Sequence, residues 1–534
     1  MESLDAFLTR VGTMNLLKLR IPTGFRLKAH GCEERATLGL RHPISITLKG
    51  LRLIPKGPRF SERRPFESKF VCHHNSPPAL LNWCFRFPAI ALFTSFALAA
   101  SVVSTRADSL LLTGAKVHTI SGETLSPGQV LVENGKISAV GTSLSAGGAK
   151  VIDLKGQHLY PGFIALNTLL GLTEISGIRA TLDTTEPGDF TPDVESWIAV
   201  NPDSELLPVA RANGIAFFEP VPQGAIVPGQ SGLVTVEGWT TEQRTAKKPI
   251  SLHLFWPVME LDTTPRPRGP PRGAPGQGPK SLEEQAKQRR AKIRATEDFF
   301  EEAKAYAKAK ESAAKGAAPA PDAVPAWEAM LPYVRGELPI TIHADEIRQI
   351  KSAVHWAASN QFNIILAGGR DAWLAAALLA SNKVPVIYGE TFELPAHDYE
   401  SYDVHFKAPE VLRKAGVKVA FCFGSTSFDA ALTRNLPYSA AQAVAFGLPE
   451  SEALKGLTLY PAQLAGVADR LGSIEAGKEA TLFAADADIL DIRANVKHMW
   501  IAGKEITLES RHTRLYEKYK SRPLTSPPGQ RASP

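Results

Sequence analysis

Hydrophobic and polar positions divide most of the chain into segments with two different periodicities. Residues 109–160 form short runs in which apolar and polar positions alternate, and Asn134 and Gly135 between two such runs are typical of a β-hairpin turn. Residues 161–465 alternate short apolar runs with longer stretches of helical periodicity, which predicts parallel β-α-β units. Residues 466–505 return to short strand-like runs. Because neither strand-rich segment has enough strands to bury its apolar face alone, we expect the two to fold together.

The central segment predicts an α/β fold, a TIM-like (β/α)8 barrel of about 250 residues or more. An eighth strand is needed, and Ser231–Val236 is interpreted as part of a hairpin in an inserted loop. The helix candidates include Ile347–Asn360, Ala372–Asn382 and Ser439–Phe446. The strand candidates are Gly162–Leu166, Gly214–Phe218, Ile250–Phe255, Leu338–His343, Asn363–Ala367, Val384–Tyr388 and Lys418–Phe423.

One insertion, residues 262–325, interrupts the barrel pattern. Thr264–Lys280 is rich in Pro, Gly and Arg and has no periodicity, so we expect a loop. Ser281–Lys315 then has helical composition, with Ser281 as the N-cap and Glu284 as its capping-box partner. Its apolar residues are too sparse for a coiled coil, which predicts a solvated helix held to the protein by its aromatic side chains.

The first hundred residues do not follow either pattern. Phe87–Val103 is apolar throughout, follows Arg86 and is followed by small residues, as in a secretory signal peptide. A retained membrane anchor is the alternative, although the run is short for a span of about 20 residues. Signals begin at the N-terminus of a protein, so we interpret the first ~80 residues as lying upstream of the true start. This predicts an exported, periplasmic or extracytoplasmic protein with no stable membrane partner after cleavage.

Export predicts that residues 1 to about 107 are missing from the mature protein. N-terminal sequencing of protein taken from the native cell envelope should therefore find a terminus close to residue 107. A mature terminus well before residue 85 would contradict this interpretation.

Charge and cysteine content both change along the chain. Residues 1–107 hold 16 Lys and Arg against 6 Asp and Glu, which leaves 44 and 48 in the rest. The net charge of +6 is thus an upstream property and gives no reason to expect a nucleic-acid partner. Cys422 is the one cysteine of the predicted mature chain, so no internal disulfide is expected. It lies in an apolar run, which predicts a buried, inert thiol.

The junction at Tyr160–Leu172 carries a family resemblance. Pro161 and Gly162 separate a strand of the first segment from the first barrel strand, and this arrangement resembles the amidohydrolase superfamily. That family has Pro-Gly-x-Ile-Asp-x-His-x-His here, whereas this chain has Asn167 and Leu169 at the two histidine positions. Further matches are Gly472–Ile474, Gly477–Lys478, and the segments Gly171–Ile175 and Arg434–Tyr438, which are similar to an exported imidazolonepropionase-like branch.

The resemblance implies a domain organisation. It comprises a composite β-sandwich from residues 108–160 and 466–510, a barrel from residues 161–465, and a tail from residue 511 to residue 534. It also implies hydrolysis of non-peptide carbon–nitrogen bonds in cyclic amides or dipeptide-like compounds, with a divalent metal such as zinc as cofactor. The partner would be a small amide substrate or ligand, and self-association into a homo-oligomer is left open.

The family's ligand positions are mostly altered in this chain. His343 ends Leu338–His343, which resembles the family's fifth strand, and is the one matched ligand, while Gly369 stands where the family's sixth strand should end in histidine. Ser425 lies where the eighth strand should present an aspartate, and Asp429 follows a few residues later as the candidate catalytic carboxylate. His253 is a further candidate at the fourth strand.

We therefore expect a pocket at the barrel's C-terminal end lined by Asn167, His343, Gly369 and Ser425, with weak or absent metal binding. Two alternatives stay open beside a metal-dependent hydrolase. One is a metal-free barrel that binds a small molecule or pairs with an active paralogue. The other is a hydrolase whose water is activated differently, for example by Asp429 with His343.

Overall fold

The structure is a computed structural model, and it describes residues 109–224, 226–263 and 280–522. The proposed signal segment Phe87–Val103, the upstream cysteines and most of the loop Thr264–Lys280 lie outside the described residues. Among the described residues, no helix is both long and apolar enough to cross a bilayer.

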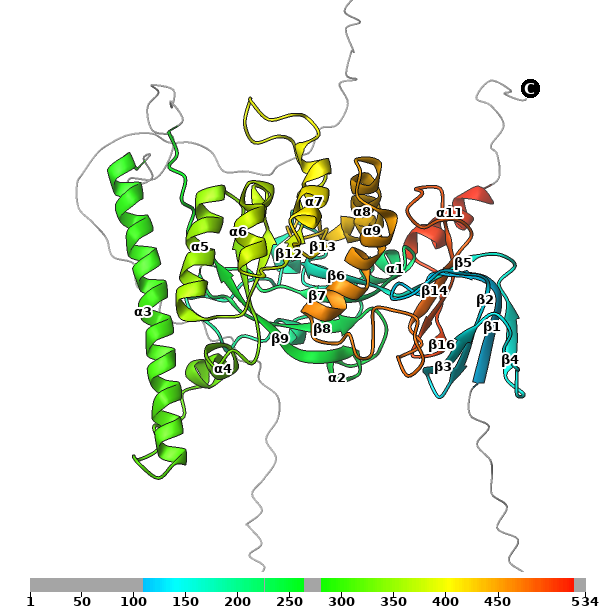
Figure 1. The fold of residues 1–534 in the computed structure, drawn as a ribbon, viewed down its shortest axis with the longest axis horizontal. Coiled ribbons are helices and arrows are strands. Elements are labelled where there is room, and N and C mark those ends of the chain that lie inside the picture. Colours follow the sequence, from blue (N-terminus) through cyan, green and yellow to red (C-terminus); the bar gives the residue numbers. More distant parts are fainter. Residues whose placement is uncertain (1–108, 225, 264–279, 523–534) are drawn as a thin grey trace, which may run out of the picture. The chain divides into compact units, whose positions relative to one another are not determined.

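Eight strands form a central sheet in the order β13-β12-β11-β10-β9-β8-β7-β6 (Figure 1). Neighbouring strands from β9 to β13 are parallel, as are β6 and β7. The strands are β6 (Phe163–Thr168), β7 (Ile215–Pro220), β8 (Gly229–Thr235), β9 (Thr245–Phe255), β10 (Ile340–Ala344), β11 (Ile364–Gly368), β12 (Val386–Tyr388) and β13 (Val419–Phe421). The predicted central strands are thus present, and the fold is mixed α/β with a nearly closed, TIM-like barrel sheet.

Strand β8 corrects one prediction. The predicted inserted loop hairpin at Ser231–Val236 is wrong, because Gly229–Thr235 is a buried strand of the barrel sheet. It pairs antiparallel with both β7 and β9. The chain between β7 and β8 is too short for the crossover that a parallel pair requires, so the strand reverses direction instead. The missing eighth strand is therefore an antiparallel one.

The first and last strands of the sheet meet at their C-terminal ends. The Leu169 N–H, just beyond β6, donates to the Gly424 carbonyl at 2.8 Å, just beyond β13. The Thr168 and Thr433 hydroxyls lie 2.9 Å apart beside it. Gly424 has φ +93°, and a Cβ atom there would overlap both threonine hydroxyls. Only glycine fits this close approach, which joins the two edges of the barrel.

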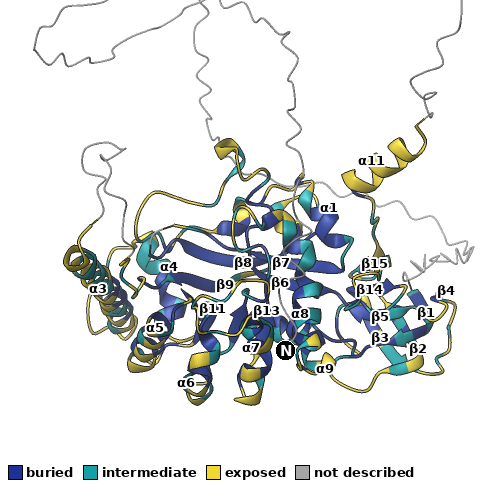
Figure 2. Cartoon of the chain, turned by 90° about the horizontal axis from the view of Figure 1, so that it is seen from above, coloured by how far each residue is buried: buried dark blue, intermediate teal, exposed yellow. Residues whose placement is uncertain are grey.

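Helices follow the parallel strands and lie along the sheet with their apolar faces inward, so that exposed residues gather on their outer sides (Figure 2). Helix α5 has the predicted bounds Ile347–Asn360 and a capping box between Glu346 and Gln349. The other helices here are α1 (Leu206–Arg211), α2 (Thr241–Arg244), α6 (Ala376–Ser381), α7 (Val404–Lys414), α8 (Leu436–Ala445), α9 (Glu450–Leu457) and α10 (Leu459–Leu464). Short 3-10 turns precede α6 and α8 at Ala372–Ala375 and Ala430–Asn435.

The long helix of the insertion is α3 (Leu282–Ala314), followed by α4 (Pro325–Val334). Ser281 caps α3 by accepting from the Glu284 N–H at 3.1 Å, which confirms the predicted N-cap. Phe300 is buried, and the Phe299 ring stacks on Phe190 with ring centres 4.5 Å apart. The helix is thus held by a few aromatic contacts while most of its surface is exposed, as the sequence predicted (Figure 2).

A second sheet combines strands from both ends of the described chain in the order β16-β15-β14-β5-β1-β2-β3, with β4 paired to β1. Tyr160 of β5 pairs with Phe483 of β14, so segments more than 300 residues apart lie side by side. This confirms that the two strand-rich segments fold together, whereas their division into two facing layers stays a prediction. The strands are β1 (Ser109–Val117), β2 (Leu125–Glu133), β3 (Lys136–Gly141), β4 (Lys150–Asp153), β5 (His158–Pro161), β14 (Leu482–Ala485), β15 (Val496–Ile501) and β16 (Lys504–Glu505); helix α11 (Arg511–Lys520) follows.

Candidate functional site

A cavity of about 440 Å³ lies at the C-terminal ends of the barrel strands. Asn167, His343 and Ser425 line it together, although they come from strands far apart in the sequence. Gly369 is not among its lining residues, and its neighbour Gly368 lies there instead. The other lining residues are Gln223, Gly224, Ile226, Phe255, Trp256, Pro257, Val258, Lys292, Asp345, Gln349, Ala367, Glu390 and Thr426.

Asn167 is held by the backbone as much as by its side chain. It is 3% exposed and has φ +54°, the left-handed region that asparagine tolerates better than most residues. Its N–H donates to Oε2 of Glu219 at 3.0 Å, and its side-chain amide donates to Sγ of Cys422 at 3.7 Å. The residue at the family's histidine position thus contributes to the packing of the barrel interior.

Cys422 is a free thiol and is 1% exposed, which confirms the predicted burial. Burial raises the pKa of its thiol far above the ordinary value, with a smaller contribution from the charge of Glu390. A thiol that stays protonated is a poor nucleophile, so the cysteine is a packing residue.

Leu169 and Asp429 do not take the places that the sequence suggested. Leu169, at the family's second histidine position, is 1% exposed and packs in the barrel core, and it does not line the cavity. Asp429 lies at the N-terminus of the 3-10 turn Ala430–Asn435, where its carboxylate accepts from the Thr426 hydroxyl at 2.6 Å. The Asp429 carboxylate does not line the cavity, while Thr426 does.

A buried chain of polar groups runs from the barrel interior to the cavity. Nδ1 of His253 lies 2.9 Å from Nε2 of His343, and Nε2 of His253 lies 3.4 Å from Oε1 of Glu219. The second contact is within ion-pair range but is not aligned as a hydrogen bond, and Nε2 of His253 has no hydrogen-bond partner in residues 109–224, 226–263 and 280–522. Period-two alternation of parallel strands places these side chains on the same inner face.

Glu219 lies at the interior end of this row of polar groups. It is 2% exposed, and besides His253 it accepts from the Ser231 hydroxyl at 2.6 Å and from the Asn167 N–H. Burial by itself would raise the pKa of Glu219, but the nearby His253 ring, and then the Ser231 and Asn167 donors, outweigh it and lower the pKa. Glu219 is therefore a buried carboxylate that stays ionised at neutral pH.

His343 is the member of this buried row of polar groups that reaches the cavity. Its ring stacks on Phe255 with ring centres 4.0 Å apart. Burial, and then the charge of His253, hold the pKa of His343 well below its usual value, so its ring is neutral at neutral pH. Nε2 of His343 contacts His253, so Nδ1 is the His343 ring nitrogen that does not contact His253.

Two cavity carboxyls were missed by sequence reasoning. Asp345 directly follows β10, and Glu390 follows β12 by two residues. Burial raises the pKa of Asp345, which Arg370 partly opposes. Burial, and then the charge of Asp345, raise the pKa of Glu390 to about 8. Their position just beyond a barrel strand was the available signal, because side chains there converge on the mouth of the barrel.

Comparison with known proteins identifies the class. A sequence profile described as the amidohydrolase family matches residues 246–506. An amidohydrolase structure from Thermotoga maritima is 27% identical, aligns with 74% of this chain and 99% of its own, and has a TM-score of 0.64. An imidazolonepropionase from Mesorhizobium japonicum is 30% identical over 145 residues, which are 27% of this chain. An amidohydrolase from Hapsidospora irregularis, tasK, is 27% identical over 191 residues, 33% of this chain and 18% of that protein.

The chain belongs to the amidohydrolase superfamily. Within it, the curated similarity is to imidazolonepropionases, and the match spans about a third of their length (34%).

The family usually binds a divalent metal such as zinc. The donor set at the barrel end does not fit that metal. Asn167 directs its amide nitrogen to Cys422, Leu169 is an apolar core residue, and Nε2 of His343 is occupied by His253. Tetrahedral zinc sites need three or four nitrogen, sulfur or carboxylate donors that converge on one point. In the described part of the chain, the three-residue group of suitable donors lies elsewhere, at Asp371, His397 and Glu400.

Proposed function

We propose that this protein is an exported hydrolase that cleaves a non-peptide carbon–nitrogen bond of a small cyclic or dipeptide-like amide in the barrel-end cavity. One observation carries the proposal: the cavity combines an acid that stays protonated near neutral pH, Glu390, with a neutral base backed by a buried carboxylate, His343 with Glu219. Environments that push the pKa values of neighbouring groups apart define acid and base roles.

The reaction follows from these groups. His343 takes a proton from water while the water oxygen attacks the amide carbonyl carbon. The proton stays on the His343 ring, and the negative charge of Glu219, on the far side of His253, partly offsets it. Lys292 at the cavity wall is the cation available to the oxyanion. Glu390 gives its proton to the leaving nitrogen as the carbon–nitrogen bond breaks, so the products are a carboxylic acid and an amine.

Activity is tested with a panel of substrates and with chelator. The purified protein is incubated with cyclic amides such as a hydantoin, a dihydropyrimidine and an imidazolone, and with dipeptide-like amides, each with and without a strong metal chelator. We expect turnover of at least one compound class that survives chelation and is lost in His343→Ala. The exposed His512→Ala is the matched control and should retain activity. Turnover that needs added zinc would contradict the proposed acid–base chemistry.

A metal-free binding protein, or a partner of an active paralogue, is the second candidate. It is favoured by the same altered ligand positions, Asn167, Leu169 and Gly369. It predicts saturable binding of a cyclic amide in the cavity without turnover, which isothermal titration measures.

Metal content gives a further prediction. In protein purified without added metal, the barrel-end cavity should hold less than one equivalent of tightly bound transition metal per chain, because the barrel-end donors are too few to complete a shell. Elemental analysis measures it directly. One or two zinc ions per chain that disappear in His343→Ala would contradict the prediction and place a metal in the cavity.

A further inference from the structure

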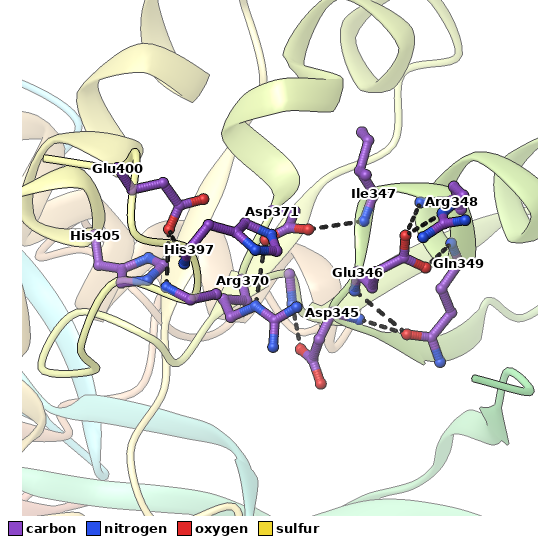
Figure 3. A network of polar contacts seen from close by, with 12 residues as sticks. Asp345, Glu346, Ile347, Arg348, Gln349, Arg370, Asp371, His397, Glu400 and His405 are labelled. Atoms are coloured by element: carbon purple, nitrogen blue, oxygen red, sulfur yellow. Dashed lines mark hydrogen bonds and ion pairs between the residues drawn. The ribbon is translucent and has the colours of Figure 1, made fainter. Parts of the chain in front are cut away.

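A group of metal-ligand side chains lies outside the cavity, between the turn after β11 and the loop from Gly389 to Asp403. Asp371, His397 and Glu400 each present one ligand atom, and these atoms lie within 4.8 Å of one another (Figure 3). Asp371 is 1% exposed, and the other two are half-buried. None of the three lines the cavity at the barrel end.

The hydrogen bonds of the two carboxylates leave room for a cation. Asp371 accepts from the Ile347 N–H at 2.9 Å and from Nε of Arg370 at 3.2 Å (Figure 3). Oε2 of Glu400 accepts from the backbone N–H groups of Ala396 and His397. Oε1 of Glu400 is buried and has no hydrogen-bond partner among the residues that the structure describes. An ionised carboxylate has about four lone-pair sites, so each of these carboxylates has acceptor capacity left.

A second, independent observation concerns His405. This side chain is 1% exposed, and its Nδ1 contacts the Tyr388 hydroxyl at 3.2 Å, while its Nε2 is buried and makes no hydrogen bond within the described part of the chain. Its ring points toward Glu400 and the backbone of His397 (Figure 3). Buried polar atoms are nearly always satisfied, so the unpaired Glu400 and His405 atoms at this ligand group favour a bound ion.

We propose that Asp371, His397 and Glu400 bind one divalent transition metal ion, with His405 available as a hydrogen-bond partner of a metal-bound water. One imidazole with two carboxylates suits zinc or manganese. Two carboxylates outweigh the single charge of Arg370, so the site keeps a net negative charge for the cation.

The ion would act as a clamp. It would join the turn after β11 to the loop that connects β12 with α7, and Glu390 lies at the start of that loop. Binding would therefore restrict the segment that carries a cavity carboxyl, without the ion itself contacting the cavity. The inference does not depend on the proposed hydrolase activity, because none of the metal ligands takes part in that chemistry.

The site is tested by titration of the purified protein after removal of metals with a chelator. Zinc, manganese and, as a spectroscopic probe, cobalt are added separately, and binding is followed by calorimetry, by the visible cobalt absorption and by the melting temperature. We expect one equivalent to bind and the melting temperature to rise. His397→Ala and Glu400→Gln should each weaken binding at least about tenfold, because ligand loss exceeds the effect of altering a supporting group.

Three controls make the outcome decisive. Glu393→Gln, an exposed acid in the same loop, and His355→Ala, an exposed histidine on α5, should bind as the unaltered protein does. His343→Ala should also keep the site, whereas loss of binding in His343→Ala would move the ion to the cavity and overturn the proposal. Circular dichroism checks that each variant is folded. If His397→Ala or Glu400→Gln does not fold, Asp371→Asn is measured in its place. No binding of any of the three ions, or equal binding by His397→Ala and Glu400→Gln, would equally overturn it.

Discussion

Replacing Glu219 with alanine should lower the free energy of unfolding by about 3–5 kcal/mol, because removal of one partner of a buried pair leaves the other charge or dipole uncompensated. Glu219 is 2% exposed and serves three neighbours, the His253 ring, the Ser231 hydroxyl and the Asn167 N–H. Water could take the place of the Glu219 carboxylate only if a cavity opened in the barrel interior. Urea denaturation followed by circular dichroism measures the loss.

Two comparisons separate the charge of Glu219 from its shape. Glu219→Gln keeps an oxygen acceptor and the side-chain volume, so it should lose less than the alanine variant. Glu133→Ala removes an exposed glutamate at the end of β2 and should change stability by no more than about 0.5 kcal/mol. If Glu219→Ala were as stable as Glu133→Ala, the buried chain of polar groups would not hold the barrel interior.

The dependence of this effect on pH has a definite sign. The pKa of Glu219 is lowered by folding, so its ionised form stabilises the folded state above the unfolded pKa. That contribution is lost as the pH falls through the folded pKa. The stability difference between the unaltered protein and Glu219→Gln should therefore be constant near neutral pH and should shrink in acid, below about pH 4.5.

The fold was largely predictable from periodicity. Helix α5 has the predicted bounds, and the parallel strands β10 and β11 begin within two residues of their predicted starts. Strand β8 was missed because a buried strand reads as a short apolar run, which periodicity alone cannot assign to a sheet or to a loop hairpin. Only the pairing of β8 with β7 and β9, which is not local in the sequence, decides the question.

The site was less predictable, and for a physical reason. Positions transferred from the family, such as Leu169, Gly369 and Asp429, follow the family's ligands rather than this chain's own packing, and the structure places none of them in the cavity. Glu219 carried a signal that was not used, because a carboxylate inside the apolar strand Ile215–Pro220 must have a buried partner. The identity of that partner, His253, depends on strand order and could not be read from the sequence.

Glu390 is the cavity group for which the largest catalytic effect is expected. Replacing it with glutamine removes the proton that the leaving nitrogen requires, and loss of a general acid usually lowers kcat by about 10²–10⁴-fold. Because burial and Asp345 raise the pKa of Glu390 to about 8, the protonated form predominates at pH 7 and is lost above pH 8. The rate of the unaltered protein should therefore fall as the pH rises through about 8.

A neighbouring acid provides the matched control for this pH profile. The charge of Glu393, three residues away, also raises the pKa of Glu390, and Glu393 is exposed and does not line the cavity. Glu393→Gln should keep kcat at its plateau but move the fall in rate to lower pH, because one of the negative charges that favour protonated Glu390 is gone. Glu390→Gln should instead lose the plateau, and its residual rate should show no fall near pH 8. The measurement is kcat between pH 5 and 10 for the three proteins with one turned-over amide. A fall near pH 8 that persists in Glu390→Gln would assign the titration to another group and remove Glu390 from the acid role.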